Sequence, residues 1–468
     1  MLFYPREAVP RMNIVFLFSD EHTSTAMGNS GHPIVRTPHL DRLASQSYTF
    51  DNAYCNSPLC TPSRLSMLTG RYPHQIEAWD LGVIANQHHQ TWGHYLAVAG
   101  YETVLCGRTH FNGHDRLMGF SHRLLDDLPF WYNTSGHPPH RTIDERRGSN
   151  SHVAECGPGE HAHTGYDQRV TELALDFLHQ KATTSDNQPF LMYCGFMHPH
   201  FPLIAPAEFF SWYDPEKLKL PPSWNQALQN QHPIIQHLRW AWRNDVPPSE
   251  ATVRRATAAY YALVSSLDTQ IGRLLAAIDA SPLRKNTVVI YTSDHGEMAG
   301  HHGIWQKQCF YQPSVKVPLM LRLPSNNCQS EVGKITQNVS LVDILPTLLD
   351  IGGLEKPSDL PGHSLLEIAR HQPNQTNRAV FSEYHHMGML SAGFMLKRGH
   401  TKLCHYVGHQ PQLFDLTNDP AEDDNLATKP EMADTLDNME KALRDICDPQ
   451  QIDERAKLNQ AARRTAPL

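Results

Sequence analysis

The sequence lacks a surplus of basic charge and has no long apolar run. Its 468 residues include 40 Lys or Arg and 48 Asp or Glu, a formal net charge of −8. This balance argues against a general nucleic-acid-binding protein. No apolar run approaches the roughly 18 residues of a membrane-spanning helix, and residues 1–12 lack the apolar core of a signal peptide. We therefore expect a cytoplasmic protein that partners neither nucleic acid nor a membrane.

The nine cysteines contain no CxxC pair, and their number is odd. This pattern excludes the disulfide framework of a small secreted domain and favours reduced thiols. The chain also has no internal repeat and no low-complexity tract. The 30 histidines are too many to share one chemical role, so position along the fold has to select the functional ones.

Short apolar, β-branched runs alternate with helical patterns along most of the chain. This alternation predicts an α/β fold with a mostly parallel central sheet sandwiched by helices. The expected strands lie at 14–18, 103–105, 190–193, 287–291 and 319–321. The expected helices lie at 38–45, 62–68, 166–180, 251–280 and 341–349.

The pattern changes near residue 375, where strand-like runs follow one another closely. These runs lie at 379–384, 393–396, 401–406 and 412–416, and a helix is expected at 430–442. We therefore predict a catalytic α/β domain at 1–375 and a smaller α+β domain at 376–468. Residues 205–250 are rich in Pro and Trp and lack clear periodicity, so we expect them to wrap the surface or shape a cleft.

The segment from Cys60 to Gly70 has the pattern of a nucleophile on the first turn of a helix. Pro62 suits the first helical position, and Gly70 suits the helix end. Cys60 would then face unsatisfied backbone N–H groups and the positive end of the helix dipole. Arg64 lies one turn further on the same face, where its guanidinium can bind an oxyanion.

Polar side chains follow four of the expected strands at their carboxyl ends. In open α/β sheets this edge is where ligands bind. The polar segments are 20–21, 107–110, 198–200, and 294–296 continuing to His301, His302 and Lys307. Asp20, Asp294 and His295 offer oxygen and nitrogen ligands, which suit Ca²⁺, Mg²⁺ or Mn²⁺.

Cys60-Thr61-Pro62-Ser63-Arg64 followed by Leu68-Thr69-Gly70 resembles the signature of the type I sulfatases, members of the alkaline-phosphatase-like superfamily. The resemblance implies that a formylglycine-generating or other sulfatase-modifying enzyme oxidises Cys60 to Cα-formylglycine. Residues 18–22 resemble the metal-binding opening strand of that family, with Glu21 where many members have Asp. Residues 293–297 and 300–307 look like the second metal-binding segment and the sulfate-binding lysine.

The same resemblance implies a role for each site residue. The implied metal ligands are Asp20, Glu21, Cys60, Asp294 and His295, with Ca²⁺ as the family's ion and Mn²⁺ or Mg²⁺ as alternatives. The implied catalytic residues are Cys60, Arg64, Arg108, His110, His200 and Lys307. Arg108 stands where the family usually has lysine, which keeps the charge but changes the donor geometry.

By this resemblance, one hydroxyl of the hydrated aldehyde at position 60 attacks sulfur. Lys307 and Arg108 hold the sulfuryl oxygens, and His200 protonates the leaving oxygen. His110 then takes a proton from the second hydroxyl, so that the aldehyde re-forms and sulfate leaves. A plain thiol has no second hydroxyl and would stop at the sulfated enzyme.

Two other functions remain open at this point. One is a phosphonate monoester or phosphodiester hydrolase on the same fold, because His295 stands where many sulfatases have Asn and resembles those enzymes as well as iduronate and choline sulfatases. The other is a catalytically silent binding protein. A homo-oligomer is also open, and His302 has either a supporting role near Lys307 or a packing role.

The substrate is expected to be a small-molecule, aryl or carbohydrate sulfate. Residues 107–120 resemble choline-sulfatase-like enzymes, and Trp131 and Tyr132 could form a cage for a quaternary ammonium, stack on a sugar or lie in the core. Residues 300–303 differ from the choline-specific pattern.

Overall fold

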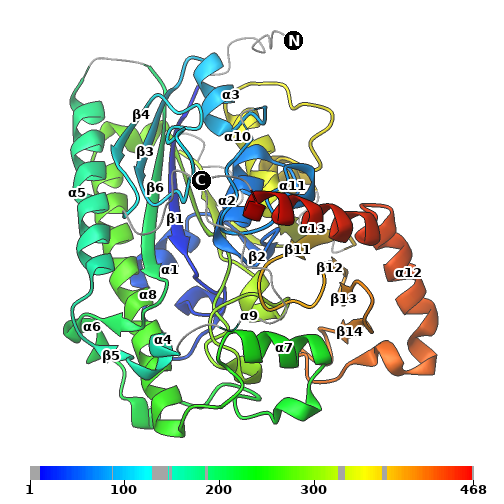
Figure 1. The fold of residues 1–468 in the computed structure, drawn as a ribbon. Coiled ribbons are helices and arrows are strands. Elements are labelled where there is room, and N and C mark those ends of the chain that lie inside the picture. The colour runs from blue at the N-terminus through cyan, green and yellow to red at the C-terminus, as the bar shows by residue number, and fades with distance from the viewer. Residues whose placement is uncertain are drawn as a thin grey trace.

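The computed structural model describes residues 11–86, 88–128, 146, 150–184, 188–324, 332–371 and 377–465. Within these ranges one large sheet occupies the middle of the molecule, with helices on both faces and a smaller sheet beside it (Figure 1). Trp131 and Tyr132 lie outside the described residues. None of the helices in the described ranges is long and apolar enough to cross a bilayer.

The large sheet has eight strands, and all but one of its strands run in the same direction. In spatial order they are β10 (Gly333–Ser340), β2 (Tyr48–Tyr54), β9 (Leu319–Arg322), β8 (Thr287–Ser293), β1 (Asn13–Asp20), β6 (Phe190–Pro199), β3 (Glu102–Gly107) and β4 (His122–Leu125). Only β9 is antiparallel to its neighbours among these strands. The predicted mostly parallel sheet and its five expected strands are confirmed, whereas β2, β4 and β10 were not predicted.

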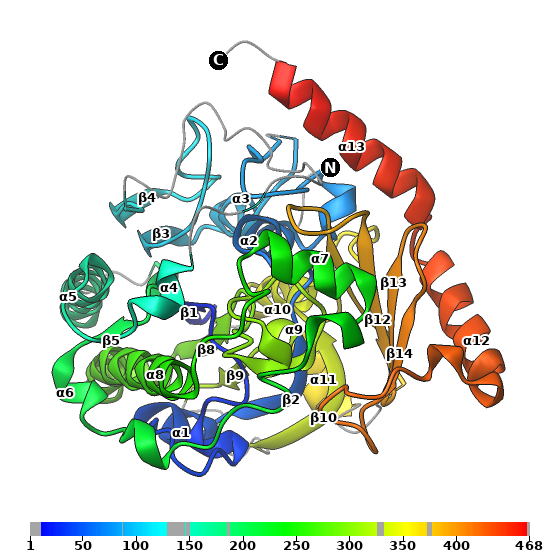
Figure 2. The same cartoon turned by 60° about the horizontal axis from the view of Figure 1, so that its bottom comes forward.

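Helices cover both faces of this sheet. One face carries α1 (Pro38–Ala44), α5 (Ala162–Thr183) and α8 (Glu250–Asp279), and the other carries α2 (Cys60–Thr69), α3 (Trp92–Val98), α10 (Ile344–Ile351) and α11 (Leu365–His371) (Figure 2). Strand β1 is buried throughout, and its side chains alternate between two apolar cores: Val15 and Leu17 face one, and Ile14, Phe16 and Phe18 face the other. This two-sided burial is typical of parallel strands.

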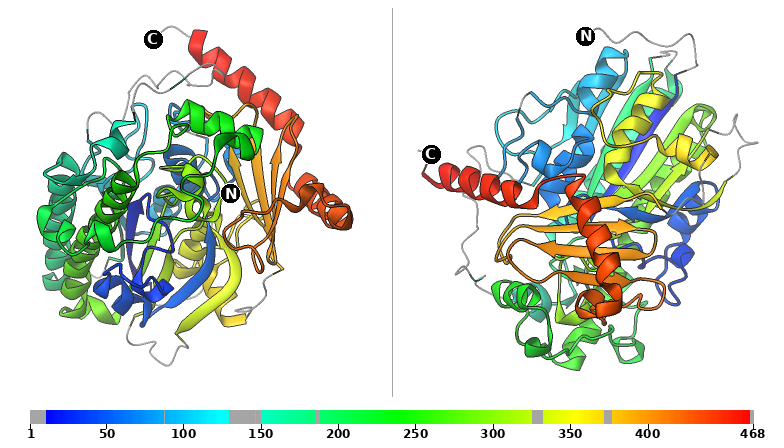
Figure 3. Two further views of the ribbon diagram at one scale, coloured as in Figure 1. Left: turned by 90° about the horizontal axis from the view of Figure 1, so that it is seen from below. Right: turned by 90° about the vertical axis from the view of Figure 1, so that its right-hand side faces the viewer.

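A second sheet lies beside the first and is wholly antiparallel. Its strands, in order, are β11 (Val380–Tyr384), β12 (Gly393–Arg398), β13 (Thr401–Tyr406) and β14 (Gln412–Asp415). Helices α12 (Ala433–Arg444) and α13 (Pro449–Thr465) lie along its outer side (Figure 3). The four strands and α12 were predicted, and α13 was not. The boundary at residue 375 lies outside the described residues, so the division into 1–375 and 376–468 stays a prediction.

Helix α2 begins two residues earlier than the sequence pattern suggested. Leu59 is still extended (φ −157°, ψ 134°), and its carbonyl accepts the first helical hydrogen bond from Ser63 N at 3.0 Å. The expectation that Pro62 occupies the first helical position is therefore wrong, because Cys60 does. Pro62 remains in the first turn, where a missing N–H removes no helical bond. Gly70 ends the helix with φ 66°, as expected.

The stretch from 205 to 250 is more regular than expected. It contains α6 (Ala207–Phe210) and α7 (Pro233–Ala241). Ile234, Ile235 and Leu238 bury one face of α7 at helical spacing, so the reading of this part as aperiodic was wrong. The remaining short elements are α4 (Ser151–Ala154), α9 (Gln312–Val315), and the paired strands β5 (Gly157–Pro158) and β7 (Ile204–Ala205).

Candidate active site

Four neighbouring parallel strands, β8, β1, β6 and β3, end at the same edge of the large sheet. Asp20 is the last residue of β1, and Asp294 directly follows β8. Arg108 follows β3, and His200 follows β6. Cys60 begins α2 beside them, so the structure gathers the polar segments that the sequence predicted to meet.

Cys60 lies at the centre of these polar residues and is buried. Its Sγ is 3.2 Å from Nε2 of His295 and 3.8 Å from Oδ1 of Asp20. Burial, together with the charge of Asp20, raises the pKa of the Cys60 thiol to about 12. The unmodified side chain is therefore a protonated thiol at neutral pH and a poor nucleophile.

Arg64 ties together the two aspartates that flank Cys60. Its Nε donates to Oδ2 of Asp294 at 2.9 Å, and its Nη2 donates to Oδ2 of Asp20 at 3.0 Å. Burial alone would lower the pKa of Arg64, but the carboxylates of Asp294 and Asp20 raise it well above its usual value. The guanidinium therefore stays charged and holds both carboxylates in place. Arg64 is not among the residues that line the cavity next to Cys60.

The side chains of Asp20, Cys60, Asp294 and His295 form a group that can hold a metal ion. Their ligand atoms all lie within 4.8 Å of one another. Nδ1 of His295 donates to the carbonyl of Gly296 at 3.1 Å, which leaves the Nε2 lone pair facing Cys60. Two carboxylates and a neutral imidazole fit a hard or borderline divalent cation.

The carboxylate of Glu21 lies beside Lys307 and His200. Its Oε2 accepts a hydrogen bond from Nζ of Lys307 at 2.8 Å and lies 3.3 Å from Nε2 of His200. Its backbone N–H donates to Oδ1 of Asp294 at 3.1 Å. Asp20, Glu21 and His200 make a second possible ligand group. The metal-binding role of Glu21 therefore stays a prediction.

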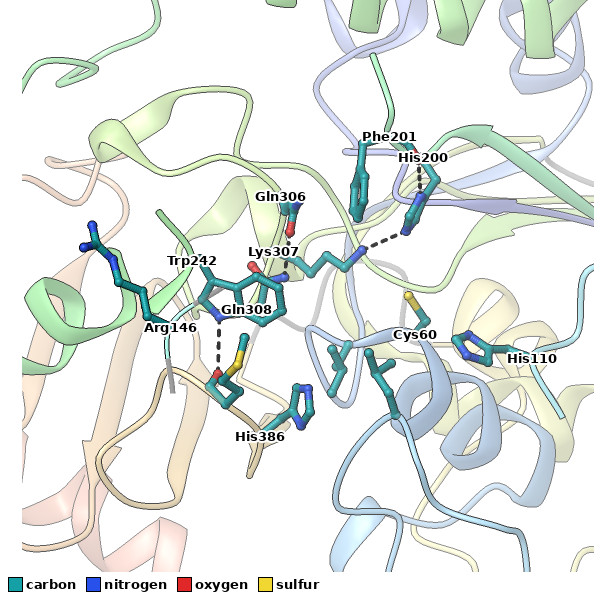
Figure 4. Close-up of a pocket in the computed structure, with 13 residues that line it drawn as sticks. Cys60, His110, Arg146, His200, Phe201, Trp242, Gln306, Lys307, Gln308 and His386 are labelled. Atoms are coloured by element: carbon teal, nitrogen blue, oxygen red, sulfur yellow. Dashed lines mark hydrogen bonds between the residues drawn. The ribbon is translucent and has the colours of Figure 1, made fainter. Parts of the chain in front are cut away.

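Lys307 and His200 form a hydrogen-bonded pair beside Cys60 (Figure 4). Nζ of Lys307 is 3.2 Å from Nε2 of His200, whose Nδ1 donates to the carbonyl of Phe201 at 2.6 Å. Burial lowers the pKa of Lys307, but Cys60, Glu21 and Asp20 outweigh it, so the pKa is raised. Burial and the charge of Lys307 hold the pKa of His200 well below its usual value. In this pair Lys307 therefore carries the positive charge and His200 is neutral.

Arg108 and His110 approach the same aspartate from β3. Nε of Arg108 donates to Oδ2 of Asp20, and its Nη2 lies 3.3 Å from Nδ1 of His110. A guanidinium can only donate, so this ring nitrogen is the acceptor. His110 has φ 59°, and its backbone N–H donates to Asp127 at 3.1 Å. His110 lines the cavity, whereas Arg108 is buried behind it, so its contact with a sulfuryl group stays a prediction.

The cavity above these residues has a volume of about 410 Å³. It is lined by Leu59, Cys60, Leu81, His110, Arg146, His200, Phe201, Trp242, Gln306, Lys307, Gln308, His386 and Met387. Of these, the sequence pattern pointed to Cys60, His110, His200 and Lys307. Gln306 and Gln308 were missed although they flank Lys307, because an isolated glutamine carries no chemical signature.

His302 does not reach this cavity. Its ring stacks on Tyr311 with centroids 4.1 Å apart, and its Nε2 lies 2.8 Å from the carbonyl of Ala421. The sequence left His302 with either a supporting role near Lys307 or a packing role, and this geometry supports the packing role.

The carboxyl edge of the mostly parallel sheet carries a buried group of carboxylates and imidazole that can hold a metal ion. Cationic side chains surround Cys60 beside it, an arrangement that suits an ester hydrolase with the alkaline-phosphatase-like fold. The family model "Sulfatase" matches residues 12–354, and the chain belongs to this family. A second model, "N-sulphoglucosamine sulphohydrolase, C-terminal", matches residues 300–448. The protein is thus a sulfatase, a hydrolase acting on sulfuric ester bonds. The family implies a divalent metal ion and a formylglycine.

Two curated relatives match along most of their length. Arylsulfatase K of Mus musculus is 30% identical over 458 residues, which cover 92% of this chain and 79% of the relative. Choline-sulfatase of Rhizobium meliloti is 30% identical over 431 residues, which cover 89% of this chain and 83% of the relative.

Solved structures share the fold. The phosphonate monoester hydrolase of Agrobacterium radiobacter superposes with a TM-score of 0.76 at 22% identity, covering 93% of this chain and 95% of that one. A protein solved in complex with its substrate D-glucosamine-2-N,6-O-disulfate superposes with a TM-score of 0.74 at 23% identity, covering 95% and 98%.

Proposed function

We propose that this sulfatase cleaves a sulfate monoester of a small-molecule, aryl or carbohydrate alcohol at the cavity around position 60. The observation that supports this most is the position of Cys60, whose Sγ lies among Asp20, Asp294 and His295 and also lines the cavity with Lys307 and His200. A sulfuryl group that reaches Cys60 therefore meets a cation on one side and the metal-binding group on the other.

The metal ion would be held by Asp20, Asp294 and His295 together with position 60. We propose Ca²⁺ as the ion, from the family resemblance, with Mn²⁺ and Mg²⁺ as alternatives. Restoring the activity of metal-free enzyme with each ion compares the three. When bound, the ion supplies positive charge that favours an ionised nucleophile. Arg64 contributes by keeping the two carboxylates charged and in position.

The nucleophile is proposed to be the hydrate of a formylglycine made from Cys60, since the thiol itself is held protonated. A formylglycine-generating or other sulfatase-modifying enzyme is therefore a proposed partner. Thr61, Pro62, Ser63 and Arg64 are all buried in the folded chain, so we propose that this partner acts before the fold closes around them.

The proton for the leaving oxygen is assigned to the pair of Lys307 and His200. His200 is neutral and its Nδ1 donates to the carbonyl of Phe201, so its Nε2 carries a lone pair and no proton of its own. Nζ of Lys307 lies 3.2 Å from Nε2, so the proton comes from Lys307 and reaches the leaving oxygen directly or through His200. His110 lines the same cavity and is kept neutral, because burial and Arg108 lower its pKa. Its lone pair on Nδ1 faces Nη2 of Arg108, so His110 can accept a proton only when that hydrogen bond opens.

A phosphonate monoester or phosphodiester hydrolase is the second candidate, favoured by His295 in the metal-binding group. Sulfate monoesters and phosphodiesters both carry one negative charge, so the same cations would bind either. A silent binding protein is the third.

The test compares steady-state kcat/KM for 4-nitrophenyl sulfate and an aryl phosphonate monoester, on protein whose formylglycine content has been measured by peptide mass. We expect the sulfate to be preferred. A strong preference for the phosphonate would establish the second candidate instead. No turnover of either ester by metal-loaded protein, with Cys60 unmodified when isolated from its native host, would establish the third.

A further inference from the structure

Helix α13 lies beyond both family models, which end at residues 354 and 448. The family match therefore assigns no role to this helix. Its side chains Ile452 and Ala456 are buried in an apolar core together with residues of the small sheet. Gln460, near the end of the helix, is only 2% exposed. A buried amide needs hydrogen-bond partners, so this residue shows what the end of the helix holds.

Gln460 donates two hydrogen bonds from one amide nitrogen. Its Nε2 donates to Oδ2 of Asp80 at 3.0 Å and to the carbonyl of His385 at 2.9 Å. Burial raises the pKa of Asp80, but Arg463 outweighs it and keeps the pKa below its usual value, so this carboxyl is ionised. A carboxylate and a carbonyl can only accept, so the amide must present its nitrogen to both. The two hydrogens of Gln460 thus join two segments that are far apart in the chain.

Each of these two segments continues directly into the wall of the active-site cavity. The lining residues concerned are Leu81, which follows Asp80, and His386 and Met387, which follow His385. Figure 4 shows His386 on the side of the cavity away from His110 and His200. On this side the alcohol part of an ester bound at Cys60 has room to lie. Gln460 therefore joins two walls of the part of the cavity that is open to the alcohol.

Other hydrogen bonds hold each of the two walls separately. Nδ2 of Asn112 donates to the carbonyl of Leu81 at 2.7 Å. Nε1 of Trp242 donates to the carbonyl of Met387 at 3.3 Å. Each of these bonds fixes one wall to its own neighbour, whereas the bonds of Gln460 fix the two walls to each other.

The groups that surround the sulfuryl site are held by other residues. Sγ of Cys60 lies 3.2 Å from Nε2 of His295. Nζ of Lys307 donates to Oε2 of Glu21 at 2.8 Å. These contacts belong to the edge of the large sheet, so loss of the Gln460 bonds should change the space for the alcohol part and leave the sulfuryl site in place.

We propose that Gln460 is a positioning residue that sets the separation of the two walls, one at residue 81 and the other at residues 386–387, between which the alcohol part of the substrate binds. Gln460 is not among the residues that line the cavity, so it acts through its two hydrogen-bond partners. Walls that are fixed before binding reduce the ordering cost that the substrate would otherwise have to offset. This inference rests on the proposed function, because it concerns the ester that binds beside Cys60.

The test compares the unaltered enzyme with Gln460→Leu, which keeps most of the side-chain volume but removes both donors. Both proteins are loaded with metal and matched in formylglycine content. KM and kcat are measured for 4-nitrophenyl sulfate and 4-methylumbelliferyl sulfate, and Ki is measured for inorganic sulfate, which fills the sulfuryl site without an alcohol part. We expect KM for both esters to rise by about 10-fold, with kcat and the Ki of sulfate changed by about 2-fold or less. Gln451→Leu, at an exposed glutamine of the same helix, is the matched control and should keep all three constants.

A purely structural role would lower the melting temperature and leave these constants unchanged. An unchanged KM in folded Gln460→Leu therefore overturns the inference, and so does an equal rise in the Ki of sulfate, which would place the effect at the sulfuryl site. Gln460→Asn keeps the amide but moves it one methylene closer to the backbone, so it should break at least one of the two bonds and raise KM as well. If neither variant folds, Gln460 supports the whole fold and the inference is wrong. Failure of the unaltered enzyme to hydrolyse any sulfate ester would overturn the proposed function instead.

Discussion

Nζ of Lys307 lies 2.8 Å from Oε2 of Glu21, so a buried ion pair joins two residues that are 286 positions apart at one side of the cavity. The same ammonium is 3.2 Å from His200. Glu21 thus directs the charge of Lys307 toward the reacting group, and it does so with the carboxylate that the sequence pattern assigned to the metal ion.

This ion pair predicts how Glu21→Gln should behave. We expect the variant to keep its bound metal while kcat/KM for a sulfate ester falls by about 10-fold, because Lys307 loses the carboxyl group that accepts its hydrogen bond and orients it. Asp294→Asn is the comparison, and it should lose the metal. Metal content measured by elemental mass spectrometry, beside steady-state kinetics, separates the two. Loss of metal from Glu21→Gln to the same extent would show that Glu21 is a ligand after all.

Replacement of Cys60 should abolish turnover rather than weaken it. We expect Cys60→Ala to lower kcat by about 10³-fold or more, because none of the other described residues that line the cavity offers an equivalent nucleophile. Mass spectrometry of the peptide with residues 60–64 should show formylglycine in the active enzyme. Full activity in a preparation whose Cys60 is entirely unmodified would contradict the proposed nucleophile.

Removal of the metal should inactivate the enzyme reversibly. Dialysis against a chelator removes the metal ion and leaves Asp20 and Asp294 paired with Arg64 alone. We expect activity to fall by about 10²-fold or more and to return with Ca²⁺, with Mn²⁺ and Mg²⁺ compared in parallel. His295→Ala should bind the ion more weakly in calorimetric titration, whereas His302→Ala, which alters a packed histidine, should bind it normally. Undiminished activity after complete chelation would refute the metal requirement.

Acid stability should depend on Glu383. Its Oε1 lies 2.8 Å from Nδ1 of His74, and its Oε2 lies 2.7 Å from Nε2 of His385. Burial raises the pKa of Glu383, but the two histidines outweigh it and lower the pKa to about 2. Because the folded pKa lies below the unfolded value of about 4.3, the contribution of ~3 kcal/mol is complete above pH ~4.3. It is then lost as the pH falls toward 2.

Chemical denaturation between pH 3 and pH 7 tests this directly. Glu383→Gln should lower the free energy of unfolding at pH 7 and flatten its decline in acid. Glu208→Gln, at an exposed position on α6, is the control and should follow the unaltered protein. If the free energy of unfolding of Glu383→Gln declined in acid as steeply as that of the unaltered protein, Glu383 would not be the source of the acid sensitivity.

Helix α13 should stabilise the wall of the active site through Asp80. Nη2 of Arg463 donates to Oδ2 of this buried carboxylate at 2.6 Å, and Nε2 of Gln460 donates to the same oxygen at 3.0 Å. Arg463→Ala leaves Asp80 buried and underpaired, so we expect a loss of about 1–3 kcal/mol in thermal or chemical unfolding. Lys441→Ala, which removes an exposed ion pair with Asp445, should change stability by about 0.5 kcal/mol or less. An equal loss of unfolding free energy in the two variants would show that the contact of Arg463 with Asp80 does not stabilise the fold.

Much of the candidate site could be predicted because parallel strands bring their carboxyl ends to one edge. Asp20, Asp294 and His295 each follow a short β-branched run, and two such runs that become neighbours place their next residues together. By contrast, α13 was not predicted, because its sequence has few apolar residues, although Ile452 and Ala456 are buried in a core cluster. Strand β2 was missed for a similar reason: its charged and amide residues interrupt the apolar pattern.

The sequence by itself determined the type of fold and predicted the nucleophile position and the residues that can hold a metal, because these depend on residue type and on spacing along the chain. The tertiary structure decided where Glu21 points, that Arg64 and Arg108 lie outside the set of residues lining the cavity, and that Gln306 and Gln308 belong to that set. These features depend on left-handed backbone angles and on hydrogen bonds to residues far away in the chain, such as that from Gln308 N to Pro58. No local pattern encodes contacts of that kind, because each exists only after distant segments have packed.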